Sequence, residues 1–432
     1  SLQGPMQKKG DQIQQASIDF QLELIGDEAA RLRIGKEKVD LVKGQWSPIF
    51  EVSFKIRLGV SVHAITRVIL NDHPSGLGLY FLPLQIHPLH SPWPYAAPRG
   101  FVKDNWKAHG PFLTLGWPQD TTGLEEGFMT EDQFLALCDS ILDNREQFFL
   151  HQVGGFKEGI LAAVFDSLDR VQHMFWRDRP DVIESWYVKL DNLLGRIQIQ
   201  AQAAGETEPK ILVVSDHGFA NFDHKVHLNR WLINEGYLAL KTPKDQGKLE
   251  DVDWSQSRTY AIGLTSIFLN LAGREGQGIV QEVEASSLLN ALKSKLLDWE
   301  GPDGRKVVHG VWRGEEAYAG PLAEYGPDLV VGFNTGYRAS AQTGLGGWEA
   351  EALEANRDHW NADHCMDPGL VPGVLFSNQG LKDLPNPSYR DFPELAIGVP
   401  LDLEESQSPK APKFSDEDQD VLEERLKDLG YL

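Results

Sequence analysis

The chain has 432 residues, of which 41% are hydrophobic and 24% are charged, a composition typical of a soluble globular protein. Its formal net charge of −22 argues against binding to a nucleic-acid duplex, which requires a basic face. No apolar run approaches the roughly 18 residues of a membrane-spanning helix, so we expect no membrane span. A chain of this length is expected to form two domains, or one domain with a large insertion.

Two features of the sequence bear on its origin. Cys138 and Cys365 are its two cysteines, and so low a count either favours a reducing compartment such as the cytoplasm or is uninformative. The opening residues, Ser-Leu-Gln-Gly-Pro-Met, are typical of an expression remnant joined to an internal piece of a longer protein. We therefore expect the natural chain to begin upstream, where a targeting signal would change the expected compartment.

The first part of the chain is predicted to be rich in β-strands. Its β-prone runs, separated by Gly, Pro or Asn-Asp, are residues 37–41, 48–56, 60–70 and 77–84. Residues 91–125 contain five prolines and are expected to be a loop. We therefore interpret residues 1–130 as a β-rich insertion subdomain with its connecting loop.

After residue 130 the pattern changes to alternating helices and strands, which is typical of a doubly wound α/β sheet. The expected elements, in chain order, are a helix opening at Thr130, a strand at 159–165, a helix at 183–203, a strand at 211–214, a helix at 228–235, a strand at 266–271, a helix at 283–299 and a strand at 327–333. We assign residues 131–401 to one α/β domain that carries the candidate metal ligands. Residues 402–432 are assigned to a linker followed by a helix at 415–429.

The strand at 211–214 leads into the most informative stretch of the sequence. Its four apolar residues predict a strand buried on both faces and central in a parallel sheet. Asp216, His217 and Gly218 follow Ser215 directly. Because ligands of open α/β sheets bind beyond the carboxyl ends of strands, this Asp and His can offer an oxygen and a nitrogen to a metal. The alternative interpretation is a polar turn in which His217 is hydrogen-bonded locally.

A second candidate pair is formed by Asp169 and His173 at the start of a predicted helix. Their spacing of four residues places both side chains on one face, within reach of one ion. A carboxylate and an imidazole so placed suit zinc. An exposed Asp/His pair at a helix start would have the same spacing, so that alternative stays open.

A third candidate cluster is Asp-His-Trp-Asn-Ala-Asp-His-Cys at residues 358–365, in a loop rich in Gly and Pro. Its density of His and Asp suits metal ligation. We interpret Cys365 as a small buried thiol beside the site rather than as a soft ligand. His359 is interpreted as an outer or surface residue.

Together these segments resemble the type I phosphodiesterase/nucleotide pyrophosphatase branch of the alkaline phosphatase superfamily, from about Gly110 to the C-terminus. The resemblance rests on the order and spacing of residues 169–176, 215–219, 226–232, 270–275, 326–331 and 363–373. It implies an alkaline-phosphatase-like doubly wound sheet flanked by helices, with the β-rich part as an insertion. It also implies a metal-dependent hydrolase that acts on a small phosphorylated substrate.

The resemblance further implies a site with two metal ions, usually zinc, about 4 Å apart. Asp169, His173 and His364 would bind one ion. Asp216 and His217 would bind the other, together with an aspartate near the family's N-terminus and a Thr or Ser nucleophile. In that mechanism the nucleophile attacks phosphorus in line, and water then hydrolyses the phospho-enzyme.

The family's opening segment, which carries that aspartate and the nucleophile, has no counterpart in this sequence. Residues 23–27 are the nearest approximation to its first strand, and Thr121 and Thr122 lack the Pro-flanked setting of a nucleophile. We therefore expect this polypeptide to bind one zinc ion or none, where its parent would bind two, and to have little or no turnover. Loss of sheet strands would also favour self-association through an exposed sheet edge.

Two alternatives stay open at this point. A sulfatase, phosphonate hydrolase or phosphomutase of the same superfamily would differ mainly in its nucleophile and substrate pocket, which lie largely outside this sequence. In the other alternative the chain is not an enzyme: residues 1–130 form an interaction module, and the metal residues are vestigial. Tightly bound zinc would argue against this non-catalytic interpretation.

Overall fold

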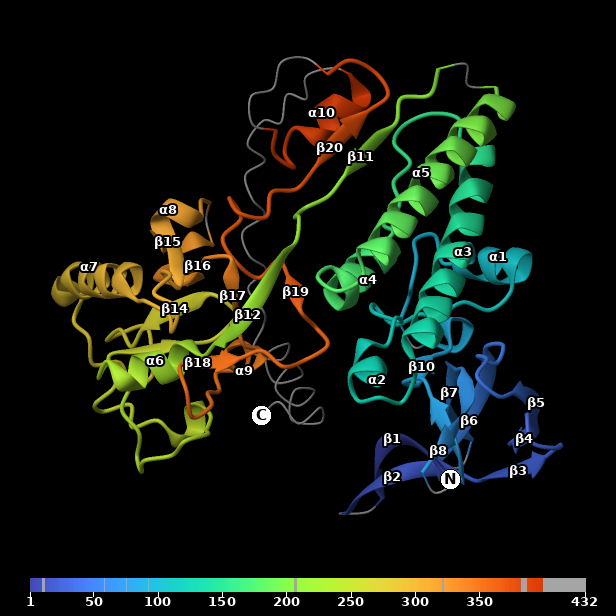
Figure 1. The fold of residues 1–432 in the computed structure, drawn as a ribbon, viewed down its shortest axis with the longest axis horizontal. Helices are drawn as coiled ribbons and strands as arrows, with labels where there is room; N and C mark the ends of the chain where they lie inside the picture. Colours follow the sequence, from blue (N-terminus) through green and yellow to red (C-terminus); the bar gives the residue numbers. More distant parts are fainter. Residues whose placement is uncertain are drawn as a thin grey trace.

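The structure is a computed structural model in which the described residues are 1–9, 12–57, 59–74, 76–91, 93–205, 208–320, 322–381 and 387–398. It is a mixed α/β fold whose strands form separate sheets of two to four strands (Figure 1). None of the helices in these ranges is long and apolar enough to cross a membrane. The helix expected at 415–429 and its linker lie outside the described residues.

The N-terminal part is rich in β-strands, as the sequence predicted, and the structure pairs them antiparallel. The strands are β1 (Leu2–Lys9), β2 (Gln12–Ile18), β3 (Phe20–Leu24), β4 (Ala29–Ile34), β5 (Glu37–Val42), β6 (Phe50–Arg57), β7 (Val60–Thr66), β8 (Val68–His73), β9 (Gly76–Phe81) and β10 (Gln85–Ile86). β4 alternates buried and half-buried residues, with Leu32 and Ile34 facing a common core. The run expected at 60–70 is two strands, because the chain leaves the ladder at Arg67, whose guanidinium donates to Ser47 O and Ser140 Oγ.

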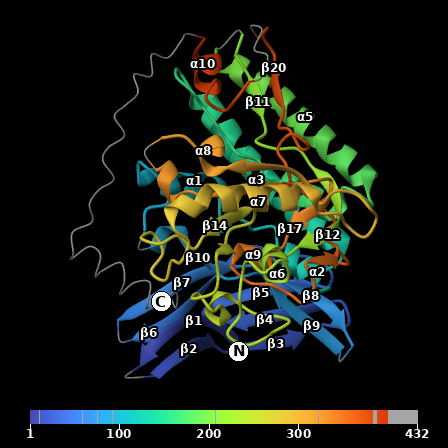
Figure 2. The ribbon, with the colours of Figure 1, turned by 90° about the vertical axis from the view of Figure 1, so that its left-hand side faces the viewer.

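Above these strands lies a layer of helices, which Figure 2 shows from the side. They are α1 (Gly100–His109), α2 (Thr121–Glu125), α3 (Glu131–Gly155), α4 (Ser167–Phe175) and α5 (Pro180–Ala203). The helix predicted to open at Thr130 is confirmed as α3: Thr130 and Gln133 form a capping box. α1 and α2 lie where a loop was expected, because the prolines of residues 91–125 flank these short helices instead of interrupting them.

The strand expected at residues 159–165 is absent, so that prediction is wrong. The segment has no strand partner among the described residues, and Ile160 and Val164 are 54% and 80% exposed. An apolar run indicates a preference for burial, but a strand also requires a neighbour that accepts and donates its ladder hydrogen bonds. The local sequence does not show whether such a neighbouring strand is present.

The strand at 211–214 forms, but not in the predicted setting. Among the described residues, β11 (Leu212–Val214) pairs only with β20 (Leu375–Ser377), and the pairing is antiparallel. Val214 is 44% exposed, so the strand is neither central nor buried on both faces. The described residues therefore form no continuous doubly wound sheet, and only the coarser prediction of an α/β fold is confirmed.

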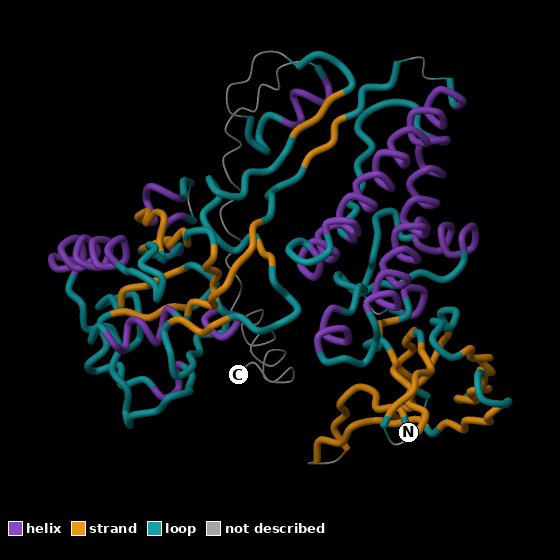
Figure 3. Tube along the Cα trace, in the orientation of Figure 1, coloured by secondary structure: helices purple, strands orange, loops and turns teal. Residues whose placement is uncertain are grey.

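The second half of the chain has its own core, coloured by secondary structure in Figure 3. Its other elements are β12 (Ala220–Val226), α6 (Leu228–Asn234), β13 (Thr259–Ala261), β14 (Ser266–Leu269), α7 (Glu282–Asp298), β15 (Val308–Arg313), α8 (Gly314–Ala317), β16 (Leu329–Phe333), β17 (Gly336–Ala339), α9 (Ala341–Gly344), β18 (Leu353–Ala355), β19 (Ala362–Asp363) and α10 (Phe392–Ile397). α6, β14, α7 and β16 confirm the elements expected at those positions.

Two connections place the candidate ligands near one another. β12 pairs antiparallel with β19, with Ala220 opposite Asp363. β19 in turn contacts α4, because the backbone N–H of Asn361 donates to the carbonyl of His173 over 3.2 Å. The turn after β11, the loop around β19 and the face of α4 therefore meet at one place in the molecule (Figure 1).

Candidate metal centre

α4 presents Asp169 and His173 on one face, one helical turn apart. His173 Nε2 lies 3.6 Å from Asp169 Oδ2, and His173 is 1% exposed. His173 Nδ1 lies 2.8 Å from the carbonyl oxygen of Ala362. Because a carbonyl only accepts hydrogen bonds, Nδ1 carries the proton and Nε2 presents its lone pair toward Asp169.

The turn after β11 brings His217 to the same carboxylate. His217 Nδ1 lies 3.1 Å from the carbonyl oxygen of Gly218, so this nitrogen is the donor and the local hydrogen bond considered from the sequence is present. His217 Nε2 is left facing Asp169 Oδ1 at 3.8 Å. Gly218 is needed here for close approach, since a Cβ at this position would lie 2.8 Å from the carbonyl oxygen of Pro372.

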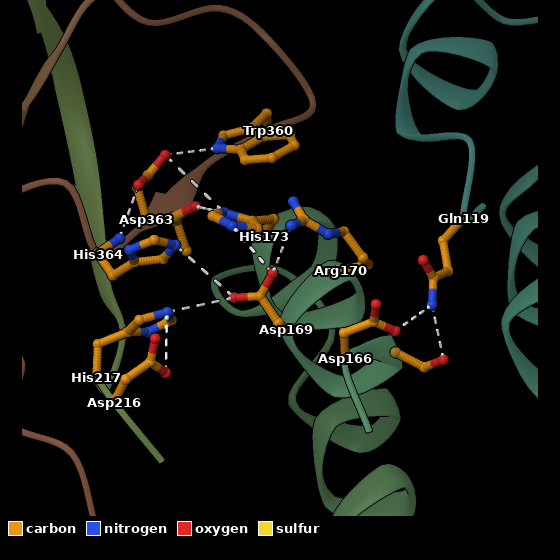
Figure 4. Close-up of polar contacts among 12 residues, drawn as sticks. Gln119, Asp166, Asp169, Arg170, His173, Asp216, His217, Trp360, Asp363 and His364 are labelled. Carbon is orange, nitrogen blue, oxygen red and sulfur yellow. Dashed lines mark hydrogen bonds and ion pairs between the residues drawn. The ribbon is translucent and has the colours of Figure 1, made fainter. Parts of the chain in front are cut away.

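His364 completes the group from the loop after β19. Its ring stacks on that of His217 with a centroid distance of 3.5 Å, and its Nε2 lies 3.8 Å from Asp169 Oδ1 (Figure 4). Its ring centroid is 5.2 Å from that of His173. The structure thus brings together the three segments that the sequence placed far apart.

Asp169, His217 and His364 each offer a ligand atom, and these atoms lie within 4.8 Å of one another. Two atoms bound at about 2.1 Å to a tetrahedral zinc ion would be about 3.4 Å apart, so small side-chain adjustments suffice to enclose an ion. Asp169 Oδ1 is buried without a hydrogen-bond partner, which is costly for a carboxylate unless a cation binds it. The residues present therefore fit a metal ion.

The grouping differs from the one implied by the resemblance. We expected Asp169 with His173 and His364, and Asp216 with His217 in a separate set. In the structure His217 lies 3.8 Å from Asp169 and 3.6 Å from Asp216, so it stands between the two sets. The side chain of Asp216 is 90% exposed, and its carboxylate faces His217 (Figure 4).

Burial sets the protonation of these groups. It lowers the pKa of His173 to about 3 and also lowers the pKa of His364, so both rings are held in the neutral form that binds metals. Burial raises the pKa of the Asp169 carboxyl, because its charge is incompletely balanced by Arg170 and His217. A bound cation would reverse that shift.

Asp363 is a residue whose role the sequence did not indicate. It is 1% exposed; Oδ1 accepts hydrogen bonds from the backbone N–H groups of His364 and Cys365, and Oδ2 accepts one from Trp360 Nε1. Arg338 Nε lies 3.0 Å from Oδ2. Burial alone would raise the pKa of Asp363, but Arg338, His173 and these donors outweigh it and hold the pKa below its ordinary value.

These contacts make Asp363 a support for two candidate ligands. It fixes the backbone of His364, and it orients Trp360, whose ring lies 3.8 Å from that of His173 between centroids. Groups behind metal ligands in this way commonly set their orientation. A signal was present in the sequence, because Asp at this position can accept hydrogen bonds from the two following N–H groups.

Two other residues of the 358–365 cluster do not join the group as ligands. Burial and the neighbouring Asp363 raise the pKa of the Cys365 thiol to about 12, so it is a protonated thiol, although Asp363, His364 and Cys365 lie close enough together to hold an ion. His359 lies 3.8 Å from Glu131 on α3, and its backbone N–H donates to Glu125.

Asp363→Asn is expected to lower the free energy of unfolding by roughly 3–5 kcal/mol, because it leaves the Arg338 charge buried and uncompensated. Urea-induced unfolding of the metal-free protein measures this. The matched control is Asp40→Asn, which breaks a surface pair with Arg31 and is expected to have a far smaller effect, since the Asp40 side chain is 72% exposed. Equal losses in the two variants would contradict the role assigned to Asp363.

A comparison with protein families bears on what such a site does. The sequence profile of the family described as type I phosphodiesterase / nucleotide pyrophosphatase matches residues 53–360. The match begins within β6, earlier than the Gly110 expected from the sequence, and it ends just before His364. No curated protein matches the chain. Because the profile covers more than half of its length, the chain belongs to the type I phosphodiesterase/nucleotide pyrophosphatase family.

Proposed function

We propose that the chain is part of a metal-dependent hydrolase of phosphate esters, in which Asp169, His173, Asp216, His217 and His364 hold zinc. Membership of a family of phosphodiester and pyrophosphate hydrolases supports the reaction class. The observation that carries the metal assignment is the buried, unpartnered Asp169 Oδ1, which has the Nε2 atoms of the two stacked imidazoles of His217 and His364 each at 3.8 Å. Zinc at this position would supply Lewis-acid stabilisation of phosphoryl oxygens.

The residues of the chain have separate tasks in this proposal. Asp169 is shared: Oδ1 faces His217 and His364, and Oδ2 faces His173. In this arrangement Asp169, His173 and His364 would hold one ion, and Asp216 and His217 would hold the other. Asp216, being exposed, would hold the ion nearer to solvent, where a substrate enters.

The nucleophile is proposed to lie outside this polypeptide. No Ser or Thr hydroxyl of the described residues is hydrogen-bonded to any of the five candidate ligands. The nearest serine in sequence, Ser215, accepts a hydrogen bond from the backbone N–H of Val374 instead. The division into a β-rich part (1–130), an α/β metal-binding part (131–401) and a C-terminal linker and helix (402–432) belongs to the same proposal.

Zinc binding is the first test. After incubation with zinc and exhaustive dialysis, we expect about one tightly bound ion per chain, measured by elemental analysis, because the group around Asp169 has more protein ligands than the exposed Asp216 set. Asp169→Ala and His364→Ala are expected to lose it. His359→Ala is the matched control, since His359 belongs to the same loop but contacts Glu131. Absence of zinc from the unaltered protein would contradict the proposal and favour a non-catalytic role.

Turnover is the second test. With a chromogenic phosphodiester and added zinc, we expect the rate for this polypeptide to equal that of Asp169→Ala, because a metal without a positioned nucleophile provides little of the rate enhancement. A rate well above that of the variant would show that a residue within residues 1–432 attacks the substrate, and it would refute the assignment of the nucleophile to another segment.

We also propose that copies of this polypeptide associate through β11 and β20. Among the described residues, β11 has a strand partner on one side only, and Phe376 on β20 is 62% exposed. Sedimentation velocity is expected to reveal concentration-dependent association that Phe376→Lys weakens. Phe101→Lys, at an exposed position on α1, is the control and should leave association unchanged. A monomer at all concentrations would disprove this surface.

A further inference from the structure

Arg170 is a buried cation whose hydrogen-bonding capacity is almost unused. It follows Asp169 on α4 and is 7% exposed. Its Nη2 lies 3.2 Å from Asp169 Oδ2, and its Nε is buried without a partner. Within the described part of the chain, the side chain of Arg170 donates no hydrogen bond, although a guanidinium carries five N–H donors. A charged group buried in this way is costly unless an acceptor binds it.

The neighbours of Arg170 keep its guanidinium beside the candidate metal ligands. The guanidinium carbon lies 4.0 Å from the ring centroid of Trp117, whose side chain covers one face of the cation and is itself 65% exposed. Figure 4 shows the guanidinium beside Asp169 and His173. Among the described lysines and arginines, Arg170 alone forms an ion pair with one of the five candidate ligands.

We propose that Arg170 binds the non-bridging oxygens of a phosphoryl group seated at the Asp169–His217–His364 cluster. The inference rests on the proposed function. Asp169 turns one oxygen to the two imidazoles and the other to Arg170, so a phosphoryl group bound beside the imidazoles lies next to the guanidinium. The planar fork of an arginine matches phosphate oxygens better than a point charge does.

Local charge supports an anion-binding role. The chain carries a net charge of −22, and two of its carboxylates, those of Asp169 and Asp216, lie at the site itself. Such a field opposes the approach of a phosphate ester, and a fixed cation beside the metals offsets this repulsion. Trp117 restricts the guanidinium to one orientation, which reduces the entropy lost when phosphate binds.

The test uses the full chain loaded with zinc, with inorganic phosphate as the probe. Zinc content is measured first, and phosphate affinity is then measured by isothermal titration calorimetry. Arg170→Gln is expected to weaken phosphate binding roughly 10- to 100-fold while the zinc content is unchanged. The phosphate affinity of Arg170→Lys should lie between those of Arg170→Gln and the unaltered protein, since lysine keeps the positive charge but lacks the planar pair of N–H donors. Arg145→Gln is the matched control: Arg145 pairs with Asp166, the N-cap residue of the same helix, forms no ion pair with a candidate ligand and should not affect phosphate binding.

Several outcomes would overturn the inference. If Arg170→Gln binds phosphate as tightly as the unaltered protein, Arg170 does not contact the anion. If the variant loses zinc while phosphate affinity per bound zinc is unchanged, Arg170 only orients Asp169. If the unaltered protein binds no zinc, the proposed function fails and this inference fails with it. Circular dichroism checks that each variant is folded. Trp117→Ala is a second variant: it keeps the charge of Arg170 but removes the ring that covers the guanidinium. We expect it to lose less phosphate affinity than Arg170→Gln.

Discussion

The antiparallel pairing of β12 with β19 is the constraint on which the candidate metal centre depends. It sets Ala220 opposite Asp363, and therefore brings the turn that carries His217 to the loop that carries His364. The same short strand β19 receives the Nδ1–H of His173 at the carbonyl of Ala362, which fixes α4 against the sheet. A slip of one residue would turn Asp363 to the opposite face and separate it from Arg338.

Two aspartates at this junction have opposite environments, and the contrast separates their roles. Asp363 accepts hydrogen bonds from Trp360 and from two backbone N–H groups and forms an ion pair with Arg338, so its charge is satisfied by the protein alone. Asp169 keeps a buried oxygen without a donor, and its pKa is raised. A satisfied carboxylate stabilises the fold, whereas an unsatisfied one beside neutral imidazoles is the arrangement that an ion completes. Metal binding is then coupled to the stability of this junction.

The sequence predicted the features that depend on neighbouring residues. α3 begins at the expected capping residue, α5 and α7 follow their apolar periodicity, and the strands of residues 37–86 follow their alternation. The spacing of Asp169 and His173 correctly predicted a shared helical face, because that geometry is local. Motif order allowed His364 to be named as a candidate although nothing in its own segment identifies its distant neighbours.

What the sequence could not predict depends on contacts between distant segments. Among the described residues, the apolar run at 159–165 has the composition of a strand but no strand to pair with, and β11 has a strand partner on one side only. The proximity of His217 to Asp169 follows from the β12–β19 register, which no local pattern encodes. Asp363 has contacts of both kinds. Its hydrogen bonds from the next two backbone N–H groups are local and could be predicted, but its charge is balanced by Arg338 on the distant strand β17. Only the folded chain identifies that partner, and it is the partner that allows Asp363 to remain ionised behind the candidate ligands.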